Sequence, residues 1–172
     1  MDFQIFGETL KIKSKKATIA FDPKQSIQKF DADCVILQDN DSDISRINNY
    51  RIVIDGPGEY EISGLKISGI KSEGGTIYVL SSENINTIVT KASYLEKFSS
   101  DKIGEYQIVI INADSEINES KITAMEPRLI ILYGIRATEG AKILGKENPQ
   151  ILPKISISEE KLPEEIEIML LA

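Results

Sequence analysis

Short apolar runs separated by turn residues dominate the first half of the chain. Thr9–Lys13 alternates apolar with polar side chains, as a strand does when one face is buried and the other meets solvent. Residues 34–37 are apolar throughout, which is typical of a strand covered on both faces. The pattern predicts strands at residues 3–6, 9–13, 17–21, 34–37, 51–54, 59–62, 65–70, 76–80 and 86–90.

The second half alternates between apolar strands and short helical segments. Residues 108–111 and Leu129–Tyr133 read as buried strands. Helices are predicted at 93–102, 115–125 and 141–144, with Ser115 and Thr138 as N-cap residues. Residues 151–157 and 165–171 return to strand. This order predicts an α/β fold, a β-sandwich with helices packed on the outer faces, as one domain spanning residues 1–172.

Charge narrows the range of partners. The formal net charge is −7, which argues against nonspecific binding to nucleic acid or to an anionic membrane. The densest basic cluster is Lys11, Lys13, Lys15 and Lys16, read either as a solvated strand edge or as an anion site. The N-terminus lacks the basic and apolar regions of a signal peptide, and no apolar run reaches the ~18 residues of a membrane span. We therefore expect a cytoplasmic protein.

The histidine and cysteine content of the chain argues against most forms of nucleophilic catalysis. The chain contains no histidine and a single cysteine, Cys34. One cysteine excludes an internal disulfide, and its apolar neighbours predict a buried thiol. Without histidine, neither a serine nor a cysteine nucleophile has its usual base. A Ser–Lys arrangement stays open, but no spacing in the sequence singles one out. We predict no catalytic residue.

The segment Gly56-Pro57-Gly58-Glu59-Tyr60-Glu61 is interpreted as structure. It lacks the lysine and the following helix of a phosphate-binding P-loop, so a tight turn explains it better. Glu59 and Glu61 share one strand face and Tyr60 takes the other. The two glutamates could pair as acid and base, but nothing else in the sequence supports a glycosidase.

The acidic stretch Asp39-Asn40-Asp41-Ser42-Asp43 is the one candidate metal loop. Carboxylates at alternate positions are how a calcium loop presents its first ligands. However, Ile44 stands where such a loop needs glycine, and Tyr50 stands where it needs glutamate. Two interpretations stay open, a solvated turn and a specific divalent-cation site formed by Asp39, Asp41 and Asp43.

Several of these stretches together resemble the metallo-β-lactamase superfamily, in the branch of small prokaryotic Zn-dependent hydrolases related to ascorbate-phosphate lactonase. The similar stretches are residues 6–23, 32–37, 54–70, 126–140 and 154–165, of which 56–61 is the most specific. The resemblance covers nearly the whole chain. It implies an αββα sandwich with a metal site after the buried strand at 34–37.

The resemblance also implies where metal ligands would stand. The H-x-H-x-D-H motif of the family places its histidines at Asp39, Asp41 and Ile44 and its aspartate at Asp43. The histidine after the first glycine corresponds to Glu8, the metal-bridging acid falls near Lys91-Ala92-Ser93, and the final histidine falls near Gly134 or Ile135. These departures remove every histidine of the family's site and the bridging acid with them.

We therefore expect a non-catalytic, metal-free protein of this fold, more a binding or interaction module than an enzyme. No cofactor and no zinc are expected, and the partner is an unknown protein or a second copy of the chain. The alternative is a hydrolase with a rebuilt oxygen-ligand site, in which Asp39, Asp41 and Asp43 hold Mg²⁺ or Mn²⁺.

Overall fold

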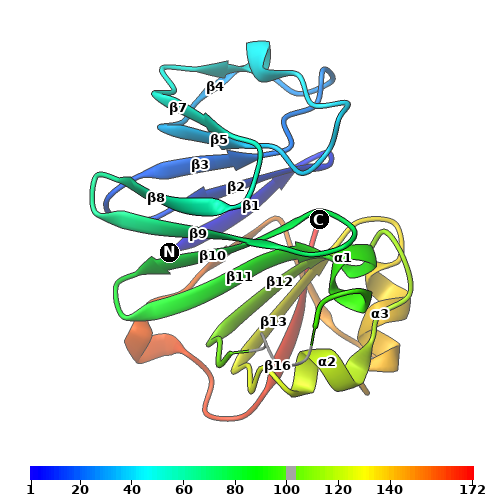
Figure 1. Cartoon of the computed structure of the whole chain (residues 1–172). Helices are drawn as coiled ribbons and strands as arrows, with labels where there is room; N and C mark the ends of the chain where they lie inside the picture. The colour runs from blue at the N-terminus through cyan, green and yellow to red at the C-terminus, as the bar shows by residue number, and fades with distance from the viewer. Residues whose placement is uncertain (100–103) are drawn as a thin grey trace.

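Two large β-sheets lie face to face, with short helices beside one of them (Figure 1). The computed structural model describes residues 1–99 and 104–172. Within these residues the sheets have six and eight strands, and a small two-stranded sheet accompanies them. The apolar strands seen in the sequence are thus buried between layers.

The six-stranded sheet is built from both ends of the chain. Its order is β15 (Lys154–Ser156), β1 (Asp2–Phe6), β2 (Thr9–Lys13), β3 (Thr18–Phe21), β5 (Cys34–Ile36) and β7 (Ile52–Ile54). The strands from β15 to β3 pair antiparallel, whereas β3, β5 and β7 run parallel. The carboxyl ends of β3 and β5 therefore meet at one end of the sheet.

The eight-stranded sheet also mixes the two kinds of pairing. Its order is β14 (Gln150–Leu152), β16 (Glu167–Leu171), β13 (Leu129–Tyr133), β12 (Ile108–Asn112), β11 (Ile85–Lys91), β10 (Thr76–Ser82), β9 (Leu65–Lys71) and β8 (Gly58–Ile62). From β14 to β11 the strands are parallel, and from β11 to β8 they are antiparallel.

The main core lies between the two large sheets. Phe21 of the six-stranded sheet packs edge-on against Tyr78 of the eight-stranded sheet, with ring centroids 6.1 Å apart. Ile12 and Ile131 belong to the same buried cluster and are at most 1% exposed. Burying such side chains stabilises the fold by about 1.5–3 kcal/mol each.

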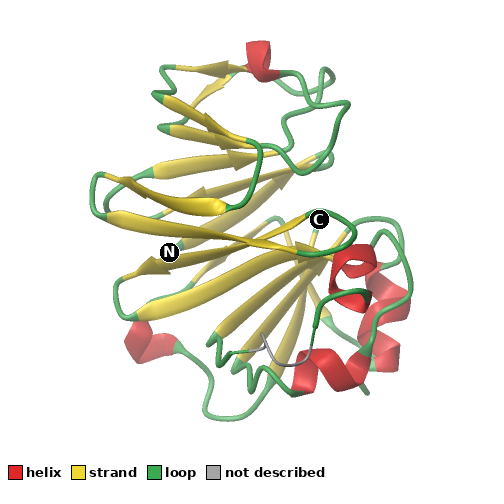
Figure 2. Ribbon diagram, viewed as in Figure 1, coloured by secondary structure: helices red, strands yellow, loops and turns green. Residues whose placement is uncertain are grey.

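The outer faces of the two sheets are covered differently (Figure 2). Helices α1 (Ala92–Glu96), α2 (Glu119–Thr123) and α3 (Ala137–Ile143) cover the eight-stranded sheet, where Leu95, Ile122 and Ala141 are buried. A small sheet of β4 (Phe30–Asp31) and β6 (Ile47–Asn48) covers Ala20 and Val35 on the other side. No helix in the described part of the chain is long and apolar enough to cross a membrane. The predicted α/β sandwich is confirmed, with its helices on one outer face.

Both predicted N-cap residues are wrong. α2 begins after Asn118, whose side-chain oxygen accepts a hydrogen bond from the Lys121 backbone 3.3 Å away, and not after Ser115. Thr138 lies inside α3, which begins after Arg136. Asn and Ser are about equally good caps, so packing of the flanking chain decides between them. The helix predicted at 93–102 is the shorter α1, and its last residues fall outside the described ranges.

The strand predicted at 151–157 is two strands in different sheets. β14 pairs with β16 in the eight-stranded sheet, and β15 pairs with β1 in the six-stranded sheet. Pro153 stands between them, and it has no N–H to donate to a ladder. The chain therefore changes sheets at this proline.

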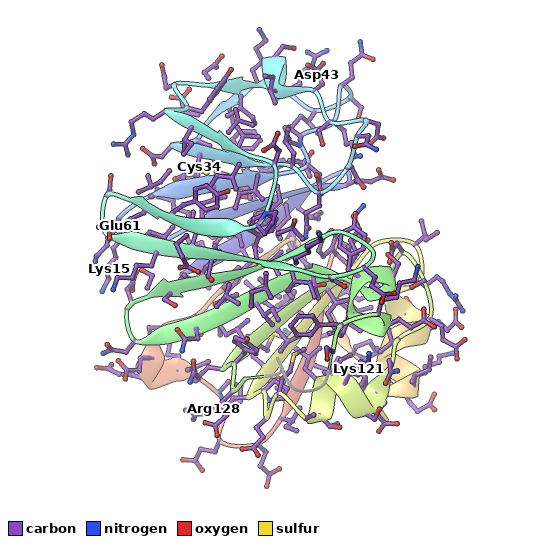
Figure 3. The ribbon with its side chains drawn as sticks, viewed as in Figure 1. Lys15, Cys34, Asp43, Glu61, Lys121 and Arg128 are labelled. Carbon is purple, nitrogen blue, oxygen red and sulfur yellow. The ribbon has the colours of Figure 1, made fainter. Side chains whose placement is uncertain are left out.

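The predictions for the basic cluster and for Cys34 have different outcomes. Lys11 and Lys13 lie on β2, an interior strand of its sheet, so the strand-edge interpretation is wrong. Lys11 instead lies over the Phe30 ring, and Lys15 forms an ion pair with Glu83. Cys34 is buried between the sheets (Figure 3), and burial raises the pKa of its thiol to about 12. The thiol is therefore inert, as predicted.

The Gly56-Pro57-Gly58 turn is a structural element. The Tyr60 hydroxyl donates to the Gly56 carbonyl oxygen at 3.1 Å, as expected for a packing tyrosine. The turn lies directly over Gly69 of β9, where a Cβ would be 2.9 Å from the Gly56 oxygen and 3.1 Å from the Pro57 Cα. Backbone atoms cannot move aside as a flexible side chain can.

We expect Gly69→Ala to lower the free energy of unfolding by about 1–3 kcal/mol, because it overpacks this contact. Gly56→Ala is the matched control, since nothing lies within 4 Å of a Cβ there. The control should stay within about 0.5 kcal/mol of the parent. Urea denaturation of both variants tests this, and equal losses would show that the close approach is not what the glycine serves.

Candidate functional site

Three neighbouring parallel strands end in polar side chains. Lys91 ends β11, Asn112 ends β12 and Tyr133 ends β13, and the ladder pairs Lys91 with Asn112 and Asn112 with Tyr133. Two residues earlier on the same strand faces, Val89, Ile110 and Ile131 belong to the core between the sheets. The three polar side chains are therefore on the inner face, at the open end of the sandwich.

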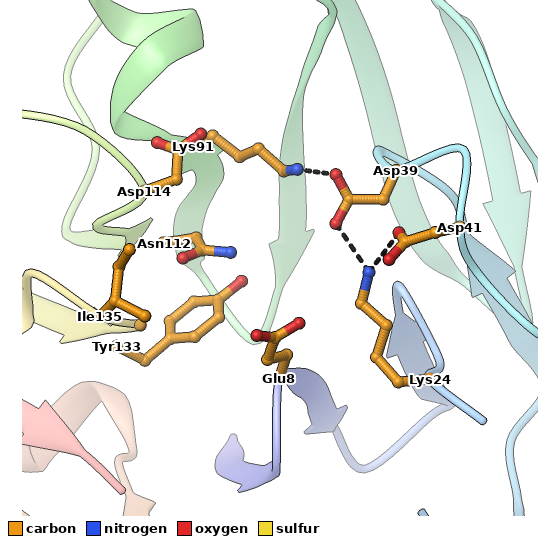
Figure 4. A pocket seen from close by; sticks show the side chains of 10 residues that line it. Glu8, Lys24, Asp39, Asp41, Lys91, Asn112, Asp114, Tyr133 and Ile135 are labelled. Carbon is orange, nitrogen blue, oxygen red and sulfur yellow. Dashed lines mark hydrogen bonds and ion pairs between the residues drawn. The ribbon is translucent and has the colours of Figure 1, made fainter. Parts of the chain in front are cut away.

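The six-stranded sheet supplies the opposite wall. Lys24 follows β3, Asp39 and Asp41 follow β5, and Glu8 lies in the turn between β1 and β2. Together the two walls enclose a cavity of about 230 Å³ (Figure 4). Its lining is Glu8, Lys24, Asp39, Asp41, Lys91, Asn112, Asp114, Tyr133, Gly134 and Ile135. Ligands of α/β sheets commonly bind at such carboxyl ends of strands.

Asp39 is shared by two lysines. Its Oδ2 accepts from Lys24 Nζ at 3.1 Å, and its Oδ1 accepts from Lys91 Nζ. Lys24 Nζ also lies 2.5 Å from Asp41 Oδ1. The side chains of Lys24 and Lys91 are only 12% and 10% exposed, whereas that of Asp41 is 74% exposed. These contacts tie the two sheets together at their open end.

The electrostatics of the cluster follow from burial and pairing. The hydrogen bond from Lys24 holds the pKa of Asp41 below its ordinary value. Burial lowers the pKa of Lys91, and the nearby carboxylates of Asp22 and Asp114 oppose that shift. Direct contact with Asp39 favours the charged ammonium form.

Asp22 holds the loop that carries Asp39. Its Oδ1 accepts from the backbone N–H groups of Gln38 and Asp39 at 2.6 and 2.8 Å and from the Ser42 hydroxyl at 3.2 Å. The residue has a φ of +47° and is 3% exposed, and burial raises the pKa of its carboxyl group. Sequence reasoning overlooked this aspartate, although an Asp-Pro pair directly after a strand marks it.

The three aspartates proposed from the sequence do not converge. Asp39 and Asp41 line the cavity, but Asp43 caps a 3₁₀ helix (Ile44–Arg46) by accepting from the Ser45 N–H at 3.0 Å. Asp43 lies on the outer side of the six-stranded sheet (Figure 3). Ile44, at the third histidine position of the implied motif, is 37% exposed and absent from the cavity lining.

The later ligand positions implied by the family resemblance are occupied by residues that cannot replace the expected ligands. Lys91, near the expected bridging acid, contributes a cation to the cavity. Gly134 has a φ of +94°, and a Cβ there would come within 2.3 Å of the Asn112 side-chain oxygen. A histidine at Gly134 would thus displace Asn112. Ile135 lines the cavity with a side chain that is 86% exposed.

Sequence reasoning assigned no role to Lys24, Asn112, Asp114 or Tyr133. Asn112 and Tyr133 directly end buried apolar strands, which is a usable signal because strand ends form binding sites in α/β proteins. Lys24 carries no such signal, since its partner comes from a different loop.

The layers and strand order define the metallo-β-lactamase fold, and solved structures with this fold resemble the chain. One is a candidate Zn-dependent hydrolase of the metallo-β-lactamase superfamily from Thermotoga maritima, with a TM-score of 0.76, 20% identity, and coverage of 99% of this chain and 98% of that one. Another is the metallo-β-lactamase fold protein YhfI from Bacillus subtilis, with a TM-score of 0.53, 7% identity and coverage of 94% and 88%.

A diphosphatase from the PhnP family is similar at a TM-score of 0.51 and 9% identity, with coverage of 93% of this chain and 79% of that one. No family model and no curated protein sequence matches the chain. At identities this low, the likeness shows the fold alone.

The residues in the cleft do not fit zinc. A hydrolytic zinc needs about three protein ligands, drawn from His, Cys and carboxylates, and a bound water. The chain has no histidine, and its one cysteine is buried elsewhere. In the described part of the chain, no three acidic or cysteine side chains converge as metal ligands. Both oxygens of Asp39 already accept from lysines.

We expect Asp39→Asn to lower the free energy of unfolding by about 1–3 kcal/mol, since it leaves a partly buried ammonium without its acceptor. Asp41→Asn is the control and should cost less, because that side chain is mostly in solvent. Urea denaturation at low and high salt measures both variants. Equal effects would show that Asp39 does not hold the two lysines.

Proposed function

We propose that this protein is a non-catalytic binding module with a metallo-β-lactamase fold, and that it works without a metal ion. The observation that carries the proposal is the placement of Lys24 and Lys91. Their ammonium groups contact Asp39 and Asp41, which occupy the first two ligand positions implied by the family resemblance.

Lysines in this place supply charge but not hydrolytic chemistry. A catalytic zinc activates water through an open coordination position, which lowers the pKa of the water to about 7. An ammonium group offers only N–H donors and no such position. The absence of histidine also removes the commonest general base. Hydrolysis by the usual route of this fold therefore lacks both its nucleophile and its base.

The cleft nevertheless keeps the features of a binding site. It is concave, it encloses about 230 Å³, and it lies where strand ends from two sheets converge. A protein partner or a second copy of the chain could cover its mouth, where Ile135 is exposed. The net charge of −7 disfavours nucleic acid and anionic membranes as partners. A cytoplasmic location is part of this proposal.

We expect the untagged protein, purified without chelator, to contain far less than one zinc, manganese or magnesium ion per chain by elemental analysis. Its melting temperature should not change when these ions are added, because a ligand that binds the native state must raise it. A polyhistidine tag must be absent, since it would supply the ligands that the chain lacks.

One ion per chain would contradict the proposal. If that ion were lost on replacing Asp39, Asp41 and Asp43 together, the alternative of an oxygen-ligand hydrolase holding Mg²⁺ or Mn²⁺ would replace it. Loss on replacing Asp39 and Asp41 alone would place the ion in the cleft without Asp43.

The lysines themselves can be tested by removal. In the double variant Lys24→Met and Lys91→Met, the carboxylates of Asp39 and Asp41 lose their counter-charges. Hard divalent ions prefer such oxygen ligands. We expect this variant, unlike the parent, to melt at a higher temperature when Mn²⁺ or Ca²⁺ is added. At an ion concentration of 100 times Kd, the free energy of unfolding should rise by about 2.7 kcal/mol.

The matched control carries Asp39→Asn and Asp41→Asn in addition and should show no such response. If the lysine variant is unfolded without ions, circular dichroism follows its refolding on ion addition. A lysine variant that is folded and indifferent to every ion would show that the lysines do not take the place of cations.

A further inference from the structure

Tyr133 presents an unpaired hydroxyl group to the cavity. Its side chain is 3% exposed, and no group in residues 1–99 or 104–172 forms a hydrogen bond with its hydroxyl. Figure 4 shows the hydroxyl pointing into the cavity between Asn112 and Glu8. The hydroxyl borders the cavity and not the closed interior, so it is free to form a hydrogen bond with a molecule that binds there. Burial raises the pKa of this phenol far above its ordinary value, which keeps it a donor.

Further donors converge on the same space. The Asn112 amide, at the end of β12, forms no hydrogen bond with any group in the described ranges. Lys91 has three N–H donors and gives one to Asp39. Tyr133, Asn112 and Lys91 therefore form a donor cluster on three adjacent strand ends, held in register by the parallel ladder.

Three of the four carboxylates that line the cavity, those of Asp39, Asp41 and Asp114, already accept hydrogen bonds from groups in the described ranges, and that of Glu8 does not. Asp39 accepts from both lysines, and the oxygens of Asp114 accept from the Ser93 N–H at 3.0 Å and from the Ser93 hydroxyl at 2.6 Å. None of these three carboxylates accepts from Tyr133 or Asn112, so an acceptor from outside can use the donor cluster, and a carboxylate group supplies two oxygens for it.

The charges of the lining restrict what that carboxylate can belong to. Two lysines face four carboxylates, those of Glu8, Asp39, Asp41 and Asp114, so the lining has a formal charge of −2. The lysines compensate Asp39 and Asp41, which leaves Glu8 and Asp114, both exposed. A plain anion would be repelled, whereas a ligand with a positive group near Glu8 would be attracted.

We propose that the cavity binds a small α-amino acid as a zwitterion, with its carboxylate on Tyr133, Asn112 and Lys91 and its ammonium group on Glu8. At about 30 Å³ per water, the cavity equals roughly eight waters, which leaves room for a small member of the class such as alanine. The inference rests on the proposed function, since it assigns a ligand to the metal-free cleft.

The test uses the metal-free, untagged protein and isothermal titration with L-alanine, acetate and ethylamine. Alanine should bind. Acetate carries only the negative group of alanine and ethylamine only the positive group, so each should bind at least about tenfold more weakly. Binding of acetate or ethylamine as tightly as alanine, or no binding of alanine, would overturn the proposal. Metal in the purified protein would overturn the proposed function instead, so the two failures are distinguishable.

Two tyrosine variants separate binding from stability. Tyr133→Phe should weaken alanine binding about tenfold or more while the melting temperature stays the same or rises, because the lost hydroxyl had no protein partner. Tyr60→Phe is the matched control, since its hydroxyl is bonded to the Gly56 carbonyl oxygen away from the cavity. It should lower the melting temperature and leave alanine binding unchanged. Unchanged binding in Tyr133→Phe would overturn the proposal.

Glu8→Gln tests the position of the ammonium group. Removing this exposed carboxylate should weaken the binding of alanine and strengthen the binding of acetate. The change removes an attraction for the ammonium group of alanine and a repulsion of the acetate carboxylate. Both ligands changing in the same direction would contradict the assigned orientation.

Discussion

The carboxylate of Asp39 is the contact on which the open end of this molecule depends. It bonds to one lysine from each sheet, Lys24 after β3 and Lys91 at the end of β11. Strand ends from the two sheets bring polar and charged side chains together at this end of the molecule. A carboxylate that pairs with two ammonium groups lowers the cost of burying these charges, because each charge is desolvated only in the presence of its opposite.

A second, more deeply buried carboxylate makes that arrangement possible. Asp22 accepts hydrogen bonds from the backbone of Gln38 and Asp39, and this fixes the loop from which the Asp39 side chain extends. The Tyr94 hydroxyl of α1 also donates to the Gln38 carbonyl oxygen at 2.8 Å, so the loop is also held by the helix that follows β11. The ion pairs are therefore preorganised by neutral and charge-assisted hydrogen bonds behind them.

The cavity combines side chains that already have hydrogen-bond partners with side chains that have none among the described residues. Both oxygens of Asp39 already accept from lysines, whereas Tyr133 and Asn112 have hydrogen-bonding capacity that no described protein group uses. The same cleft thus argues against metal chemistry and for a polar ligand, and the two conclusions rest on different residues.

The sequence alone determined the layers of the fold. Period-two alternation in Thr9–Lys13 and uninterrupted apolar strands such as Leu129–Tyr133 are local signals, because one strand reports by itself which of its faces are buried. The sequence also determined that histidine chemistry is absent. The resemblance to the metallo-β-lactamase superfamily implied that Asp39 and Asp41 stand at the first two ligand positions.

Only the tertiary structure decided what those aspartates do. Lys24 and Lys91 are far from Asp39 along the chain and carry no mark that distinguishes them from other lysines. Asp43 lies two residues from Asp41 in the same acidic run, yet it turns outward to cap a 3₁₀ helix. A carboxylate binds either a metal ion or an ammonium group according to which cation the fold brings within reach, and that distance is set by sheet packing and not by local sequence.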